Sequence, residues 1–89
     1  MQAPNFVSLG SICTVQGSEK KLMVVARGLV VRQDDGKQRY YDYGACLYPE
    51  GLIGEVMLYF NHDSIAEVVF QGFIDQSEEE MRAKLKAGV

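Results

Sequence analysis

The feature that most constrains this chain is a run of apolar, mostly β-branched residues over positions 21–32. It reads KLMVVARGLVVR, and its middle is apolar at successive positions, broken only by Arg27 and Gly28. The apolar part is far shorter than the roughly 18 residues that cross a membrane. It therefore predicts one long β-strand that is apolar on both faces in its middle. Because a lone glycine inside a strand usually marks a bulge or bend, we expect a bulge or bend at Gly28.

Turn signals divide the rest of the first 73 residues into further strands. Asp34-Asp35-Gly36 predicts a β-hairpin leading into a strand over residues 39–48. The remaining strands are expected over residues 9–15, 55–60 and 66–71. Between the last two, Asn61 or Asp63 is expected to cap a single helical turn. Five short strands at this spacing favour a small antiparallel barrel or a curled sheet.

The tail changes to helical periodicity. We expect a helix over residues 77–87, with Ser77 and Glu80 forming a capping box. Glutamates in its first turn and lysines in its last turn suit the helix dipole. Gly88 is placed to end the helix.

The apolar stripe of this helix is narrow, because only Met81 and Leu85 lie one turn apart on it. Two hypotheses follow from such a stripe. The helix is either a lid that covers an open sheet edge or barrel end, or a detachable element that exchanges with an apolar surface of a partner.

These patterns define a single domain over residues 1–89, with a strand-rich part at 9–73. The predicted fold class is mainly β. We expect a small antiparallel SH3-like barrel, or a curled five-stranded sheet, with one C-terminal α-helix. A chain of 89 residues can bury enough surface to fold without disulfides or metal.

The charge balance bears on partners and location. The formal net charge is -3, which disfavours phosphate backbones and anionic lipids, so we expect no nucleic-acid partner and no membrane insertion. The N-terminus lacks the basic start and apolar stretch of a signal peptide. We therefore expect a cytoplasmic protein.

No set of residues points to catalysis or to a cofactor. His62 is the only histidine, and Asp63 is its only evident neighbour for a metal or a proton. Cys13 and Cys46 lie in apolar strand-like runs without a positive neighbour, so we expect buried, reduced thiols. We predict no enzyme activity, no cofactor and no metal site.

Tyrosines are the most suggestive residues for binding. In strict strand alternation Tyr41 and Tyr43 share one face and Tyr40 and Tyr48 share the other, unless a bulge near Gly44 intervenes. Exposed aromatic rings and the helix stripe make good interface groups. The residues that we predict to bind protein are Tyr40, Tyr48, Tyr59, Met81 and Leu85.

Two other hypotheses stay open. One is a small-molecule-binding domain or minor enzyme with a pocket near Tyr43, Glu50 and His62. The other is a homo-oligomeric structural domain.

Several segments resemble a bacterial family, domain-of-unknown-function family 4176. They are LGSI at residues 9–12, KKLM at 20–23, YDYGACLYPEG at 41–51, FNHDSI at 60–65 and VVFQGF at 68–73. The resemblance covers residues 9 to about 85. It implies a small cytosolic protein of Gram-positive bacteria, encoded near type VII secretion loci and LXG-type toxins. It further implies an adaptor or chaperone for a secreted toxin or secretion factor, and no enzyme activity.

Overall fold

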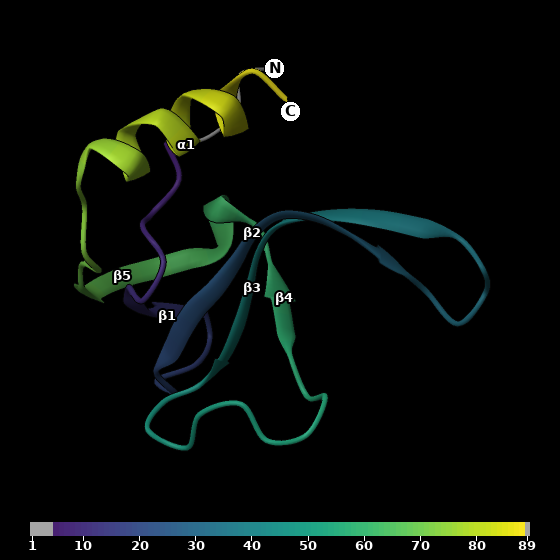
Figure 1. Ribbon diagram of the computed structural model, residues 1–89. Helices are drawn as coiled ribbons and strands as arrows, with labels where there is room; N and C mark the ends of the chain where they lie inside the picture. The colour runs from purple at the N-terminus through teal and green to yellow at the C-terminus, as the bar shows by residue number, and fades with distance from the viewer. Residues whose placement is uncertain (1–4, 89) are drawn as a thin grey trace.

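A computed structural model describes residues 5–88, which form one curled sheet and one helix (Figure 1). The elements are β1 (Ile12–Val15), β2 (Leu22–Arg32), β3 (Gln38–Leu47), β4 (Leu58–Phe60), the 3-10 turn η1 (His62–Ser64), β5 (Ile65–Phe70) and α1 (Gln76–Lys86). The strand order is β4-β3-β2-β1-β5, and every pair is antiparallel. The predicted curled sheet with a C-terminal helix is confirmed. The sheet does not close into a barrel, because β4 and β5 are its two edges.

β2 and β3 are the longest strands of the sheet, and they form the predicted hairpin. Asp35 accepts a hydrogen bond from the Lys37 amide (2.9 Å), and Gly36 takes a positive φ of 83°. The two strands pair from Leu22 to Arg32. Their far half projects from the body of the molecule in Figure 1.

The predicted irregularity in β2 is present, but it has two parts. The β2–β3 register shifts between Val24 and Ala26, which places the bulge before the glycine. Gly28 itself adopts a φ of 59°, which is left-handed backbone that glycine accepts without strain. A Cβ at Gly28 would also lie 3.1 Å from the Leu85 side chain on α1, so the helix approaches the sheet closely here.

The two faces of the sheet differ in what covers them. On the inner face, the Tyr43 ring packs on Phe60 of β4 and on Phe6 of the N-terminal segment. On the outer face, the Tyr41 ring stacks on Tyr59 (5.5 Å between centroids). Tyr59 and Phe60 are adjacent on β4 and therefore point to opposite faces. Their partners Tyr41 and Tyr43 consequently do not share a face. The strict alternation that we expected is broken.

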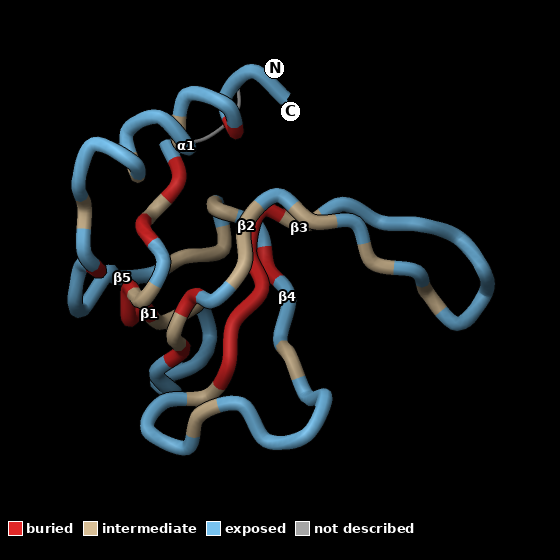
Figure 2. Tube along the Cα trace, viewed as in Figure 1, coloured by how far each residue is buried: buried red, intermediate tan, exposed pale blue. Residues whose placement is uncertain are grey.

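The core lies between the inner face, the N-terminal segment and α1 (Figure 2). Its buried residues are Phe6, Cys13, Leu22, Val24, Tyr43, Ala45, Phe60 and Leu85. Burial of Cys13 raises the pKa of its thiol. Cys46 is also buried, so both cysteines are placed as predicted.

The ends of α1 correct one prediction and confirm another. Asp75, and not Ser77, caps the helix, since its carboxylate accepts a hydrogen bond from the Glu78 amide (3.0 Å). The expected Ser77–Glu80 capping box is therefore wrong, by two residues. At the other end Gly88 has a φ of 81° and its amide donates to the Leu85 carbonyl, as predicted for a C-terminal glycine.

The β4–β5 region also departs from the predictions in detail. β4 begins at Leu58, because residues 55–57 belong to the preceding loop. A single turn does follow, with Asn61 as its N-cap residue, but the Asn61 side chain makes no capping bond. It accepts instead from the Asp42 amide (3.0 Å), which ties the turn to β3.

Candidate protein-binding site

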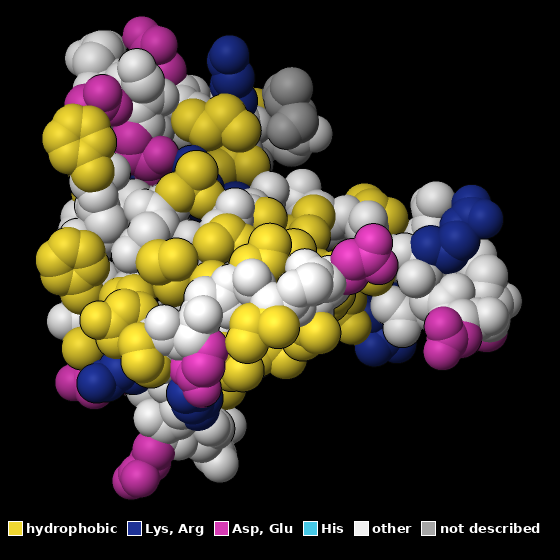
Figure 3. Space-filling model, turned by 60° about the horizontal axis from the view of Figure 1, so that its bottom comes forward, with side chains coloured by type: hydrophobic (Ala, Val, Ile, Leu, Met, Phe, Trp, Pro, Cys, Tyr) yellow, Lys and Arg dark blue, Asp and Glu magenta, His cyan; other side chains and the backbone are white. Residues whose placement is uncertain are grey.

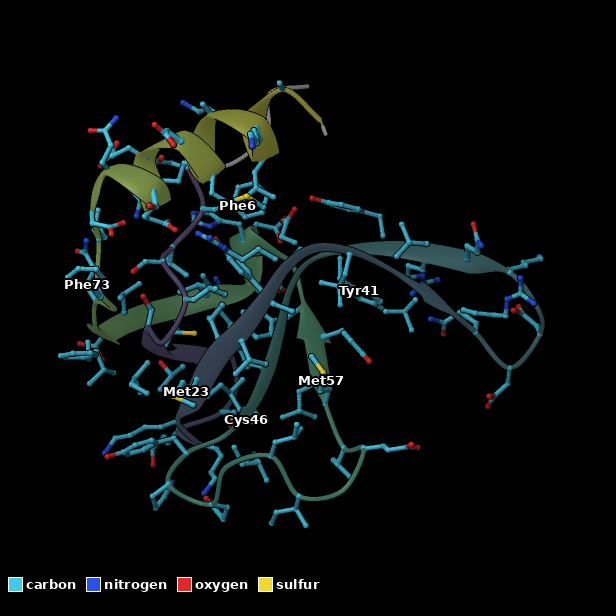
Figure 4. All side chains as sticks on the ribbon, in the orientation of Figure 1. Phe6, Met23, Tyr41, Cys46, Met57 and Phe73 are labelled. Atoms are coloured by element: carbon cyan, nitrogen blue, oxygen red, sulfur yellow. The ribbon has the colours of Figure 1, made fainter. Side chains whose placement is uncertain are left out.

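The outer face of the sheet is apolar and is not covered by the helix. The register places Phe70, Ile12, Met23 and Cys46 directly opposite one another across four strands. Ile12 and Cys46 are themselves buried, but neither belongs to the core cluster on the inner face. Figure 4 shows Met23 and Cys46 close together at the lower end of the hairpin. Hydrophobic side chains form a broad continuous band on the side of the molecule seen in Figure 3.

A pocket of about 380 Å³ opens at the β5 end of this face. We name it the β5 edge site, and its lining residues are Gly10, Ile12, Lys21, Tyr48, Val69 and Phe70. Phe70 is 61% exposed, although it is a large aromatic residue on a strand. The walls are therefore aromatic and aliphatic, which is the composition of a binding pocket for an apolar side chain.

Lys21 supplies the only charged side chain of the lining. Within residues 5–88 it takes part in no ion pair, whereas its neighbour Lys20 is paired with Glu50 (2.7 Å). An apolar pocket with one free cation at its rim suits a ligand with an apolar group beside a carboxylate.

β5 offers this site as an edge strand. Among the residues that the structure describes, it pairs with β1 alone, and most of its own residues are exposed. Two register shifts interrupt the pairing, between Ile12 and Cys13 and between Thr14 and Val15. Bulges on an edge strand discourage unselective strand pairing.

A second hollow of about 430 Å³ lies between the sheet and α1. Its apolar lining comprises Leu9, Phe73 and Met81. Phe73, in the segment between β5 and α1 (Figure 4), is 81% exposed. The molecule thus presents large apolar side chains on both sides of β5.

An ion pair that the sequence analysis missed forms the floor of this second hollow. Arg27 donates two hydrogen bonds to the Glu78 carboxylate (2.6 and 2.8 Å) and one to the Val7 carbonyl (3.1 Å). These bonds from Arg27 hold the pKa of Glu78 below its ordinary value. The signal in the sequence was a single arginine inside an otherwise apolar strand, since a buried cation requires a partner.

The five residues predicted to bind protein do not form one surface. Tyr48 lines the β5 edge site, and Met81 lines the second hollow. Tyr40 is exposed on the far part of the β2–β3 hairpin, and Tyr59 stacks on Tyr41. Leu85 is buried in the core, so it holds α1 to the sheet and is not accessible to a partner.

The residues of the pocket suggested near Tyr43, Glu50 and His62 take part in other contacts. The Tyr43 hydroxyl lies 2.6 Å from His62 Nδ1 and accepts from the Val7 amide (3.0 Å). Tyr43 is fully buried, and burial raises the pKa of its phenol to about 12. Glu50 lies in the turn after β3, where it is paired with Lys20.

The polar groups around His62 serve the fold. The Asp42 carboxylate accepts from the His62 amide (2.8 Å), which fixes the start of the 3-10 turn against β3. Within residues 5–88, no three His, Cys, Asp or Glu side chains are grouped to hold a metal ion. The helix of the described chain also lacks the length and apolar character needed to cross a membrane.

Comparisons with known proteins give one match. The family model described as "Domain of unknown function (DUF4176)" matches residues 6–81. Neither the curated proteins nor the solved structures include a match to the chain.

Proposed function

Because this chain belongs to the DUF4176 family, a domain of unknown function, we propose its role from the surface that the fold leaves open. The protein is a protein-binding module that holds a partner at the β5 edge site. The observation that carries this proposal is the exposed aromatic pocket beside the edge strand β5. Monomeric proteins seldom expose large apolar patches that have no partner.

The chemistry of the site describes the partner segment. Ile12, Tyr48 and Phe70 would surround an apolar side chain of the partner. Lys21 would attract an acidic group next to that side chain. The partner segment would run along β5, with its apolar anchor in the pocket.

We further propose that the module acts in the cytosol as an adaptor or chaperone for a secreted protein. The support for this step is membership of the family, which the resemblance links to type VII secretion and LXG-type toxins. An exposed apolar binding surface suits such a role, because a secretion substrate presents apolar segments before it is exported.

Affinity capture from the native cytosol tests the proposal. The wild-type chain is compared with a double variant, Val69→Lys with Phe70→Lys, which charges the β5 edge site. The matched control is Leu52→Lys with Ile53→Lys, since these are also adjacent, exposed apolar residues but lie outside the pocket.

We expect one protein to be retained by the wild type and by the control, and lost with the β5 variant. Titration of that protein, once purified, should give a dissociation constant at least tenfold weaker for the β5 variant. Equal capture by all three chains would overturn the assignment of the site. A captured protein with no link to secretion would overturn the secretion role alone.

A further inference from the structure

The far half of the β2–β3 hairpin, residues 29–41, is a two-stranded arm without support from the rest of the sheet. β1 pairs with β2 only at Leu22 and Met23, and β4 pairs with β3 only over residues 43–45. Figure 1 shows the arm projecting beyond both. A two-stranded hairpin is marginally stable by itself in water, so pairing with a third strand would stabilise an arm of this kind.

The arm exposes apolar side chains. Val30 and Tyr40 are cross-strand partners, and they are 60% and 50% exposed. Edge strands normally limit such exposure, because an open row of amides and carbonyls invites pairing. The edge of β3 that faces β4 carries the Asp42 amide, which donates to Asn61. Beyond Asp42, along the arm, the same edge of β3 is free within residues 5–88.

The total surface is larger than a compact chain of this mass needs. The accessible area is 6188 Å² for 9.9 kDa. The usual scaling gives about 5200 Å² for a compact monomer of that mass, which leaves an excess of about 1000 Å². A standard interface buries about 800 Å² on each partner. The excess therefore matches what one side of a stable dimer requires.

We propose that a second copy of this chain covers the arm, with the two β3 edges paired antiparallel about a two-fold axis at Tyr40. This arrangement sets Tyr40 against the partner's Tyr40, and Arg39 against the partner's Tyr41. Aromatic pairs of this kind stabilise antiparallel strands, and a cation also packs well on an aromatic ring. No two like charges lie directly opposite over residues 39–41.

A copy of the same chain is the occupant that fits best. A two-fold axis uses the same edge twice, and closed two-fold dimers are the commonest oligomers. Pairing joins two unsupported arms into one four-stranded ribbon. The dimer goes beyond the proposed function, since it uses the free edge of β3, whereas the β5 edge site lies at the other end of the strand order.

The mass in solution is the first test, measured by sedimentation equilibrium on the full chain. We expect twice the 9.9 kDa of the chain for the wild type. Tyr40→Lys sets two cations against each other and should give a monomer. Val69→Lys, an equal change on the other edge, should stay dimeric. A monomeric wild type at its highest soluble concentration would overturn the proposal, whether or not another protein binds the arm.

Cysteine crosslinking then tests the geometry. Tyr40→Cys places two thiols opposite each other at the axis, within the Cα separation of about 4.4–6.8 Å that a disulfide spans. Val30→Cys is the control, because Val30 lies on β2, one strand further from the two-fold axis than Tyr40. The two introduced cysteines would then be separated by three strand spacings, about 14 Å. The native cysteines are buried and should not interfere.

Oxidation should convert Tyr40→Cys to a covalent dimer while Val30→Cys stays uncrosslinked. Equal or faster crosslinking of Val30→Cys, or none of Tyr40→Cys, would refute pairing through β3. Capture of a partner at the β5 edge site is unaffected by either variant, so the two proposals fail independently.

Discussion

At the residue scale, Arg27 and Glu78 form an ion pair that joins sheet and helix. Their side chains are only 4% and 10% exposed. Glu78→Gln leaves the guanidinium without its counter-charge, so we expect a loss of about 3–5 kcal/mol in the free energy of unfolding. Urea unfolding measures it. Glu79→Gln, on the exposed neighbour, should change stability by less than about 0.5 kcal/mol.

The pH dependence of this pair has a defined sign. The bonds from Arg27 lower the pKa of Glu78 in the folded protein. The contribution of Glu78 to the free energy of unfolding is therefore complete above the pKa of a glutamate in the unfolded chain, about 4.3. It is lost as the pH falls through the lower folded value. The stability difference between wild type and Glu78→Gln should therefore shrink in acid. A difference that stays constant or grows below pH 4 would contradict the role of the ion pair.

Gly72 is the glycine whose missing side chain matters most. A Cβ there would collide with the Leu9 carbonyl and lie 2.9 Å from the Ser11 amide nitrogen. Its own amide and carbonyl are bonded to the Ser11 and Ser8 hydroxyls (3.0 and 2.8 Å).

We expect Gly72→Ala to destabilise the chain by about 3 kcal/mol or more, because backbone must move to admit the methyl group. Thermal unfolding measures the effect. The comparison is Gly17→Ala, which has open space and only the positive φ to accommodate, at a cost of about 1–2 kcal/mol. Equal losses in both variants would show that the packing around Gly72 does not matter.

At the scale of elements, α1 is defined by one cap and one buried residue. Asp75→Ala removes the observed cap and should cost about 1 kcal/mol. Ser77→Ala should change stability by less than about 0.5 kcal/mol, since its hydroxyl makes no capping bond. Chemical denaturation of the two variants distinguishes the caps. A larger loss for Ser77→Ala would restore the capping box predicted from the sequence.

The docking of α1 separates the two hypotheses for this helix. Leu85 is buried against the core, while Met81 is exposed at the second hollow. Leu85→Ala should cost about 2–5 kcal/mol, and Met81→Ala below about 1 kcal/mol. That result, read from thermal unfolding, supports a lid held to the sheet. Little loss of stability in Leu85→Ala would favour a detachable helix.

At the scale of the whole molecule, Cys13 and Cys46 report on cooperative opening. Both are buried, on β1 and β3. We expect slow thiol labelling of the native chain and fast labelling in denaturant, with both cysteines reacting at the same rate if the sheet opens as one unit. Mass spectrometry of the labelled peptides resolves the two sites. Rapid native labelling at either cysteine would show that its strand opens locally.

Local patterns in the sequence determined the elements of this protein. The apolar run in β2, the Asp34-Asp35-Gly36 turn, the period of α1 and Gly88 all act within a few residues, so a single sequence reveals them. The curled antiparallel sheet and the burial of both cysteines also followed from such patterns.

Only the tertiary structure decided which residues meet. Ser8 bonds to Gly72, and Arg27 to Glu78, across separations of 64 and 51 residues. Tyr41 and Tyr43 face opposite sides, since Tyr41 packs on Tyr59 and Tyr43 packs on Phe60. The residue that caps α1 is Asp75, which accepts from the Glu78 amide, and the Glu78 carboxylate is bound by Arg27 of the sheet. Contacts of this kind depend on chain path and packing, which residue periodicity does not encode.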